Sequence, residues 1–269
     1  MSAERRACSL CGGDARWTCT QRLLGKYDVD YFTCTTCELF QTEAPHWLDE
    51  AYSQAMSRLD TGAVQRNETS ARLTELVAML VEIAPSATCL DYGGGHGVFV
   101  RMMRDAGLDF RWFDKYAENL FSRGFEGDPS QHHALVTAFE VLEHFADARA
   151  DLDKLFAAQP DFVLVGTVLH HGHQPGWWYY LLESGQHVAF YSRRTLAWIG
   201  EHYGYDVIAG DEYSLFAKKA PSAMRVKIVR HVLLRPTALV RIVPRSLLRR
   251  LGPYRSRTQS DHDAMRGAK

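Results

Sequence analysis

A cluster of glycines directly after an apolar run is the feature that most constrains how this chain can fold. Residues 89–97 read CLDYGGGHG, with four glycines within five positions. Glycine permits a tight turn, and its missing side chain lets a ligand approach the main chain. Turns between a strand and a helix are where open α/β sheets bind their ligands. The segment therefore predicts a ligand-binding turn at the edge of a parallel sheet.

The sequence on both sides of this loop alternates between strand-like and helix-like patterns. Short apolar runs predict strands at 87–92, 109–114, 134–141 and 161–169. Helical patterns cover 70–84, 97–107, 117–125, 150–159 and 192–204. Residues 205–219 predict two short strands around a turn, which must be antiparallel neighbours. The alternation predicts a doubly wound, mostly parallel sheet.

Composition and charge divide the chain into four parts. We expect a small β-rich module at 1–45, a helical linker at 46–69, the sheet domain at 70–220 and a tail at 221–269. From residue 216 onward there are 14 Lys or Arg and two acids, whereas the rest holds 17 basic and 30 acidic residues. The body is therefore acidic and the tail is basic.

Three kinds of ligand compete for the glycine loop. A nucleoside triphosphate would need Gly-Lys-Ser/Thr at the end of the loop, and a dinucleotide would prefer G-x-G-x-x-G. Here Asp91 precedes glycines spaced G-x-G-x-G, and a carboxylate there suits an ammonium or sulfonium group better than a pyrophosphate. Asp114 ends the next strand, 23 residues later, where it can accept hydrogen bonds from ribose hydroxyls. The pattern favours S-adenosylmethionine.

The loop Asp91-x-Gly93-x-Gly95-x-Gly97 resembles motif I of the class I S-adenosylmethionine-dependent methyltransferases, and Asp114 matches their ribose-binding acid. The resemblance implies a Rossmann-like sheet of seven strands with its last strand inserted antiparallel. It also gives a place to FEVLEHF at 139–145, similar to the acid-x-x-Glu-His step near the methionine end of the cofactor. Glu140 is then a cofactor contact. For Glu143 and His144, a functional role and a purely structural one remain equally open.

Four of the six cysteines form two pairs, Cys8-x2-Cys11 and Cys34-x2-Cys37. Two such knuckles complete a tetrahedron of thiolates around Zn²⁺, as in a zinc ribbon. Four thiolates leave no open position, so the metal is expected to be structural. Residues 1–50 hold five basic residues and eight acids, which makes the module a poor phosphate binder. No nucleic-acid partner is expected, although an RNA-binding or RNA-modifying protein is the alternative reading.

The zinc module, the class I core and GQHVAFYS at 185–192 together resemble the sugar methyltransferases, especially the nucleotide-deoxysugar C-methyltransferases. The resemblance implies that His187 is the catalytic base, and His144 is the second candidate. The relatives carry Tyr and Glu just before that histidine, whereas this chain has Ser184, Gly185 and Gln186. Both C- and O-methylation of a sugar nucleotide or glycan intermediate therefore stay open, as does a cofactor-binding scaffold without turnover.

The segment LHHGHQPGWWYY at 169–180 is a candidate substrate loop. Its aromatic residues, Trp177 to Tyr180, would either stack on sugar faces or pack as a lid. Its histidines, His170, His171 and His173, are weak candidates for a metal site because no acid or cysteine lies close by in sequence.

The basic tail interleaves arginines with Val, Leu and Ile at roughly helical spacing, interrupted by Pro236 and Pro244. Such a segment either docks on the acidic body or on another subunit, or it touches an anionic membrane surface. No apolar run approaches the roughly 20 residues of a membrane-spanning helix, and the N-terminus lacks the apolar core of a signal peptide. A cytoplasmic protein, with membrane association through the tail as an option, is expected.

Overall fold

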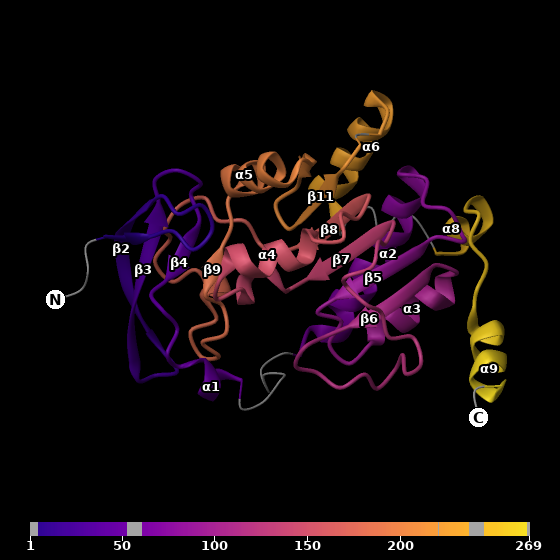
Figure 1. Cartoon of the computed structure of the whole chain (residues 1–269), viewed down its shortest axis with the longest axis horizontal. Coiled ribbons are helices and arrows are strands. Elements are labelled where there is room, and N and C mark those ends of the chain that lie inside the picture. The colour runs from indigo at the N-terminus through magenta and orange to yellow at the C-terminus, as the bar shows by residue number, and fades with distance from the viewer. Residues whose placement is uncertain (1–4, 53–60, 220, 237–244, 268–269) are drawn as a thin grey trace.

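The computed structural model describes residues 5–52, 61–219, 221–236 and 245–267. The molecule is elongated, with a small β module at one end and the C-terminal helices at the other (Figure 1). Between them lies the α/β sheet domain that carries the glycine loop.

The sheet of this central domain has six strands in the order β10-β11-β8-β7-β5-β6. The strands are β5 (Thr88–Tyr92), β6 (Asp109–Phe113), β7 (Leu135–Phe139), β8 (Phe162–Gly166), β10 (Asp206–Ala209) and β11 (Tyr213–Ala217). Neighbours are parallel from β6 through β8, and β11 runs antiparallel to both β8 and β10. The predicted doubly wound sheet with an inserted antiparallel strand is confirmed.

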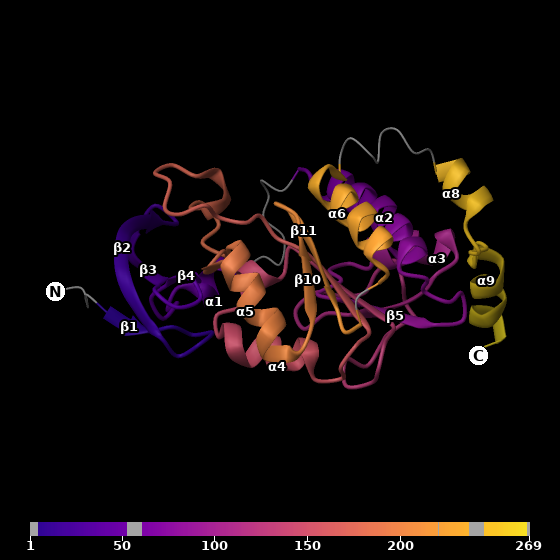
Figure 2. The ribbon, with the colours of Figure 1, turned by 90° about the horizontal axis from the view of Figure 1, so that it is seen from above.

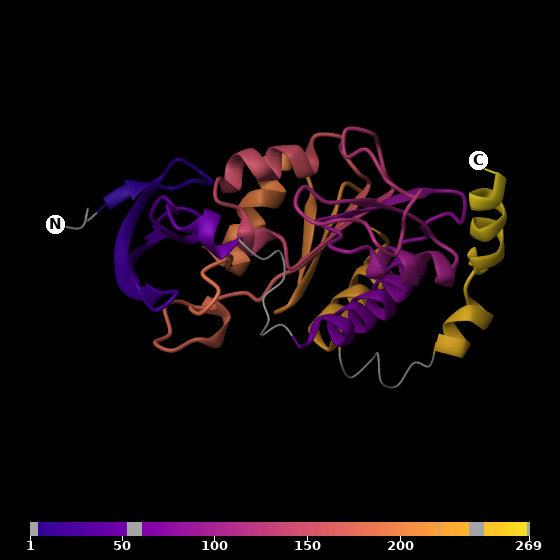
Figure 3. The ribbon, with the colours of Figure 1, turned by 90° about the horizontal axis from the view of Figure 1, so that it is seen from below.

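Helices cover both faces of this sheet (Figures 2 and 3). On one face lie α2 (Ala63–Leu80), α3 (Val98–Ala106) and α6 (Ala223–Leu234), and on the other lie α4 (Ala148–Phe156) and α5 (Arg193–Tyr203). Each face has its own core, because apolar side chains of α2, α3 and α6 form one buried cluster and those of α4 and α5 form another. The serine cap of α5 is confirmed: Ser192 accepts from the backbone of Thr195, and Gly204 ends the helix with a left-handed backbone.

Two expectations at the outer edge of the sheet were wrong. The described residues contain six strands in this sheet instead of seven, and only a single bridge between Trp112 and Glu126 continues it past β6. Residues 117–125 form no helix. Their backbone is bonded elsewhere, since the amides of Leu120 and Phe121 both donate to the His96 carbonyl. Contacts with the glycine loop thus override the local helical pattern.

The N-terminal module is a five-stranded antiparallel sheet in the order β1-β2-β3-β4-β9. Its strands are β1 (Arg5–Ala7), β2 (Asp14–Leu23), β3 (Tyr27–Cys34), β4 (Phe40–Thr42) and β9 (Ala189–Phe190). The last strand comes from far along the chain, between β8 and α5. A short helix, α1 (Leu48–Ala51), leads out of the module, and α2 begins inside the stretch expected to be a linker.

The module is packed against the sheet domain through a continuous apolar core. Buried residues of the module, among them Leu10 and Phe32, share one cluster with Leu152 of α4 and Leu196 of α5. Arg149 of α4 reinforces this contact by donating from Nε to the Leu10 carbonyl at 2.8 Å.

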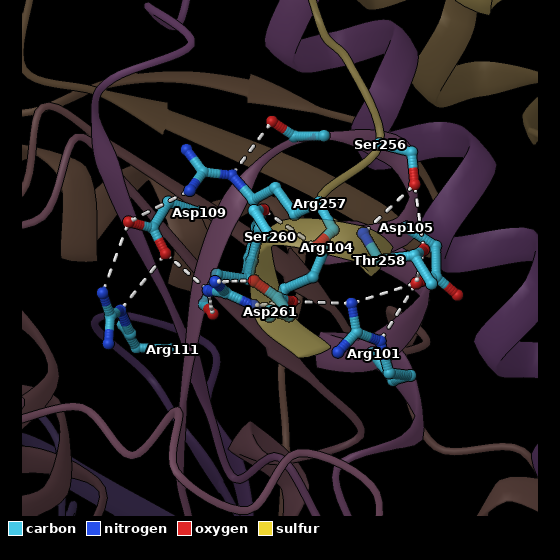
Figure 4. Close-up of polar contacts among 12 residues, drawn as sticks. Arg101, Arg104, Asp105, Asp109, Arg111, Ser256, Arg257, Thr258, Ser260 and Asp261 are labelled. Atoms are coloured by element: carbon cyan, nitrogen blue, oxygen red, sulfur yellow. Dashed lines mark hydrogen bonds and ion pairs between the residues drawn. The ribbon is translucent and has the colours of Figure 1, made fainter. Parts of the chain in front are cut away.

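The end of the basic tail docks on the outer edge of the sheet domain (Figure 4). Asp261 of α9 (Thr258–Gly267) accepts hydrogen bonds from Arg101 and from both Nε and Nη2 of Arg104, each at 2.8 Å. Arg257 donates to the carbonyl oxygens of Pro85 and Gly107. One of the tail's two acids therefore anchors it to arginines of the body, and the basic Arg257 adds an ion pair with Asp109 at 3.8 Å.

The tail also contains α6 and the short helix α8 (Arg245–Leu251). No helix in the described part of the chain is long and apolar enough to cross a membrane.

We expect Asp261→Asn to lower the free energy of unfolding by about 2 kcal/mol, because it leaves the buried guanidinium of Arg104 with one charged partner, Asp109, in place of two. Urea denaturation followed by circular dichroism measures the change. Asp263→Asn, an exposed acid on the same helix, is the control and should change stability by less than about 0.5 kcal/mol. Equal effects of the two substitutions would contradict the anchoring role of Asp261.

Candidate active site

The glycine loop joins β5 to α3 at the carboxyl edge of the sheet. The amides of Gly93 and Gly94 donate to the carbonyl of Phe113, at the end of the neighbouring strand, at 2.8 and 3.0 Å. Gly93, Gly95 and Gly97 all have left-handed backbones, with φ of 76°, 51° and 84°. The loop therefore uses glycine for conformations that other residues rarely adopt.

Two of these glycines also make room for neighbouring side chains. A Cβ on Gly93 would lie 2.5 Å from Val141, and one on Gly97 would lie 2.7 Å from Asn119 Oδ1. A Cβ on Gly95 would meet nothing within 4 Å. The backbone at Gly95 thus faces open space, as a surface for ligand approach requires.

Asp114 is held directly against the loop. Its Oδ2 accepts from the Gly95 amide at 2.9 Å, and its Oδ1 accepts from the amides of Tyr116 and Ala117 at 2.7 and 2.8 Å. Trp112 completes the contact by donating from Nε1 to the Gly95 carbonyl at 2.8 Å. The 23-residue spacing therefore brings loop and acid together, as predicted, at the ends of two adjacent parallel strands.

Asp91 lies at the end of β5 and is buried, with 4% of its surface exposed. Its Oδ1 accepts from Thr137 Oγ1 at 2.7 Å, and its Oδ2 lies close to Gly94. Burial raises the pKa of Asp91 to about 7, and the nearby charge of Asp114 contributes, while the Thr137 hydrogen bond opposes the rise. The carboxyl group is thus buried beside the glycine loop, and an approaching cation would favour its ionised form.

Glu140 immediately follows β7 and has a left-handed backbone, with φ of 54°. Non-glycine residues in this conformation cluster at functional sites. Its amide donates to the Gly166 carbonyl at 2.8 Å, which fixes the turn at the carboxyl edge. Its cofactor contact stays a prediction.

Next to this turn the fold gathers Glu143, His144 and His187. The first two lie in a 3-10 turn, η1 (Leu142–His144), and His187 lies just before β9. One side-chain ligand atom from each lies within 4.8 Å of the others, and the two imidazole rings meet edge to face at 4.9 Å. Glu143 and His187 are buried, and His144 is partly buried. The two histidines proposed from sequence are therefore brought together, with Glu143 as a third member.

Glu143 is the unusual member of this cluster. Tyr179 donates its hydroxyl to Glu143 Oε1, whereas Oε2 is buried and has no hydrogen-bond partner. Burial raises the pKa of Glu143 to about 7. A buried, half-satisfied carboxyl group in a polar cluster is a candidate for accepting a proton from a ligand.

Both histidines present one ring nitrogen to the cluster. His187 Nδ1 lies 2.8 Å from the Tyr179 carbonyl and His144 Nδ1 lies 3.1 Å from the Gln186 carbonyl, so each Nδ1 carries the hydrogen and donates it. Burial lowers the pKa of His144 to about 4 and that of His187 to about 3. Both imidazoles are therefore neutral at pH 7, and Nε2 of each carries the ring's lone pair.

Tyr52 connects the cluster to the glycine loop, and no pattern in the sequence indicated this link. Its hydroxyl lies 2.9 Å from His144 Nδ1, and its ring stacks on Tyr116 with the centroids 5.6 Å apart. Tyr116 in turn bonds to Asp114. A lone tyrosine at the end of α1 carries no motif, so only the tertiary structure could reveal this link.

The aromatic segment is partly buried and partly exposed, and stacking on a sugar stays a prediction. Tyr179 and Tyr180 are buried against the β module, as a packed lid would be, whereas Trp178 is exposed. His170 donates from Nε2 to the Glu38 carbonyl at 2.9 Å. Neither His170, His171 nor His173 joins a metal-ligand cluster within the described ranges.

The four paired cysteines also converge, at the end of the β module. Their sulfurs lie within 4.8 Å of one another, with Cys8 and Cys37 3.6 Å apart and Cys11 and Cys34 3.4 Å apart. Backbone amides donate to these sulfurs, including those of Thr36 and Cys37 to Cys34 Sγ at 3.4 Å. A four-sulfur cluster with amide donors, in which three of the cysteines are buried and Cys11 is partly buried, is compatible with zinc.

Comparison with known proteins decides the family. Residues 64–209, more than half of the chain, match the family model of a methyltransferase domain. The chain belongs to this family. Its central domain is an S-adenosylmethionine-dependent methyltransferase domain, and the match runs from the start of α2 to the end of β10. No curated protein matches the sequence.

Several solved structures are similar to this methyltransferase. The S-adenosylhomocysteine-bound CalO1 methyltransferase of calicheamicin biosynthesis is 17% identical, with a TM-score of 0.42 over 63% of this chain and 60% of that one. The mitomycin 7-O-methyltransferase MmcR is 18% identical, with a TM-score of 0.45 over 65% and 60%. Magnesium protoporphyrin IX methyltransferase from Synechocystis PCC 6803 is 13% identical, with a TM-score of 0.43 over 63% and 90%. The chain thus spans about 60% of the length of the first two, and the acceptors named here are those of the other proteins.

We expect Gly95→Ala to weaken S-adenosylhomocysteine binding at least tenfold, because a Cβ would project from the open face of the loop and strain its left-handed backbone. Isothermal titration calorimetry measures the affinity. Gly25→Ala is the matched control, since Gly25 has a φ of 70° and an equally open surrounding in a turn of the module. Equal affinities of the two variants would contradict a ligand contact at Gly95.

Proposed function

We propose that this methyltransferase acts on a sugar nucleotide or glycan-assembly intermediate and methylates an oxygen or a carbon of the sugar. The observation that carries the proposal is the buried Glu143–His144–His187 cluster beside the cofactor loop. It supplies proton-accepting groups on the side of the sheet edge where an acceptor can meet the cofactor.

The sugar class is supported by the sequence pattern. A four-cysteine module, a class I core and a late histidine in GQHVAFYS together resemble the sugar methyltransferases. In the structure this histidine joins His144, and the module contributes to the same region through Tyr52, next to α1. An acceptor of this class brings hydroxyl groups or an acidic C–H beside a ketone, and both need a base to react.

Two residues of the cluster, His187 and Glu143, are assigned to removal of the acceptor's proton. When bound, S-adenosylmethionine supplies an electrophilic methyl group on its sulfonium. His187, held by its Nδ1–H bond to the Tyr179 carbonyl, takes the acceptor proton on Nε2. Removal of this proton would leave the acceptor with the electron pair that methyl transfer uses. An ionised Glu143 beside the ring stabilises the imidazolium that results.

A direct test incubates the protein with radiolabelled S-adenosylmethionine and separate pools of nucleotide sugars and lipid-linked glycans. We expect label to enter one sugar pool, and mass spectrometry then assigns the methylated atom. If an RNA pool were added and the label entered RNA instead of sugar, the acceptor would be a nucleic acid and the sugar proposal would be wrong. Binding of S-adenosylhomocysteine without label in any pool would indicate a scaffold without turnover.

We expect kcat/KM to rise with pH through about 7, because Glu143 is protonated and neutral below its raised pKa and ionised above it. Glu143→Gln should remove this step and slow turnover at pH 8 by about tenfold or more, and His187→Ala by about 10²-fold or more. His132→Ala, an exposed histidine elsewhere, should change neither.

The spacing of Glu143, His144 and His187 would also admit a cation, so the metal content of each variant is measured alongside its rate. A bound metal that is lost with His187 would contradict its role as a base. Full turnover of His187→Ala would contradict any role in the reaction.

We also propose that Cys8, Cys11, Cys34 and Cys37 hold one structural Zn²⁺. In the absence of metal, the hydrogen bond with Cys37 lowers the pKa of the Cys8 thiol to about 5, which favours a thiolate ready to bind. Closing four buried sulfurs around one ion would fix the two turns of the module that pack on α4.

We expect about one zinc per chain by atomic spectroscopy, and Cys37→Ser to lose it and unfold the module. Cys19→Ser is the control, because Cys19 lies outside the cluster and should keep the metal. Zinc content unchanged in Cys37→Ser would contradict the site.

A further inference from the structure

The solvent-facing side of α6 carries an unusual stripe of residues. Met224, Ile228 and Leu234 are 68%, 42% and 43% exposed. Basic side chains alternate with them along the same side of the helix. The exposed residues fall on successive turns, at 224, 227 and 228, 231, and 234 and 235, as one side of a helix requires: Met224, Lys227, Ile228, His231, Leu234 and Arg235.

The fold does not need this stripe for its own packing. The opposite side of α6 supplies the buried residues Val229, Val232 and Leu233, which join the core beneath α2 and β10. Figure 1 shows the helix rising from the top of the body, with its outer side free in the described structure. The apolar residues of the stripe are therefore exposed without an intramolecular reason.

The charged side chains of the stripe are all basic. Residues 221–251 contain eight Lys or Arg and no acid. Arg225, on the flank of the helix, is used by the fold, since it pairs with Glu82 and donates to its Oε1 at 2.6 Å. Lys227, Arg230 and Arg235 form no ion pair within the part of the chain that the structure describes. They are available to an external anion.

We propose that the outer face of α6 docks the enzyme on an anionic lipid surface. The apolar side chains would enter the boundary between headgroups and acyl chains, and the basic ones would contact lipid phosphates or carboxylates. The mixture of the two favours this partner over others. A nucleic acid would leave the apolar side chains of Met224 and Ile228 exposed to water. A second copy of the same face would bring like charges together.

This inference goes beyond the proposed function and does not depend on it, because the stripe lies outside the Glu143–His144–His187 cluster. Together, however, the two would place the active site beside a membrane, where a glycan carried on a lipid is presented. Membrane binding and methyl transfer are measured separately, so either proposal can fail alone.

The test is flotation of the full-length protein with vesicles of phosphatidylcholine alone or with 30% phosphatidylserine, at low and moderate salt. We expect binding to the anionic vesicles only, weakened by salt. Ile228→Asp and Lys227→Glu should each reduce it at least fivefold. The matched controls are Val64→Asp, an exposed apolar residue on α2, and Lys154→Glu, an exposed lysine on α4, and both should bind as the wild type does.

Circular dichroism and S-adenosylhomocysteine titration establish that each variant is folded. Three results would overturn the proposal: absence of binding to anionic vesicles, equal loss of binding in the control variants, or concentration-dependent self-association that Ile228→Asp abolishes. The last would identify the stripe as an interface between copies of the chain. Retention of RNA with no retention of lipid would assign it to a nucleic acid.

Discussion

The Glu143–His144–His187 cluster depends on two backbone hydrogen bonds of Val188, which join η1 to the β module. The segment leading into β9 passes over η1, where the Val188 amide donates to the Glu143 carbonyl at 2.8 Å, and the Thr42 amide of the module donates to the Val188 carbonyl at 2.9 Å. The next two residues, Ala189 and Phe190, become the fifth strand of the module. A single stretch of chain thereby ties the β module to the sheet domain and delivers His187 next to His144. Without this pairing, His187 would no longer be held beside His144.

Burial then gives the cluster its chemistry. Removing charge from water disfavours the ionised form, so it raises the pKa of Glu143 while lowering those of His144 and His187. The three groups approach a neutral state together, in which one carboxyl oxygen has no hydrogen-bond partner. Such an arrangement costs stability unless a ligand completes it, and an acceptor with a proton to lose is a ligand of that kind.

The C-terminal tail combines two functions that the charge pattern alone could not separate. Its end is held by Asp261 against Arg101 and Arg104, at the edge where the sheet stops at β6. Its first helix contributes to the core on one side and exposes apolar and basic residues on the other. The tail is thus part of the domain and also leaves one side of α6 exposed in the described structure.

Local patterns in the sequence were sufficient for the alternation of strands and helices, the glycine loop with Asp114 and the cysteine knuckles, because strand alternation, glycine spacing and Cys-x2-Cys each act over a few residues or one strand-to-helix unit. The local pattern failed at 117–125, where hydrogen bonds to the His96 carbonyl take the place of the predicted helix. The seventh strand, which the family resemblance implied, is reduced to the single bridge between Trp112 and Glu126. Tertiary structure alone decided that Glu143 joins the two histidines, that Tyr52 links them to Asp114, and that Asp261 anchors the tail. Each of these joins residues dozens of positions apart or more, or depends on burial, and burial is a property of the packed chain that no short pattern encodes.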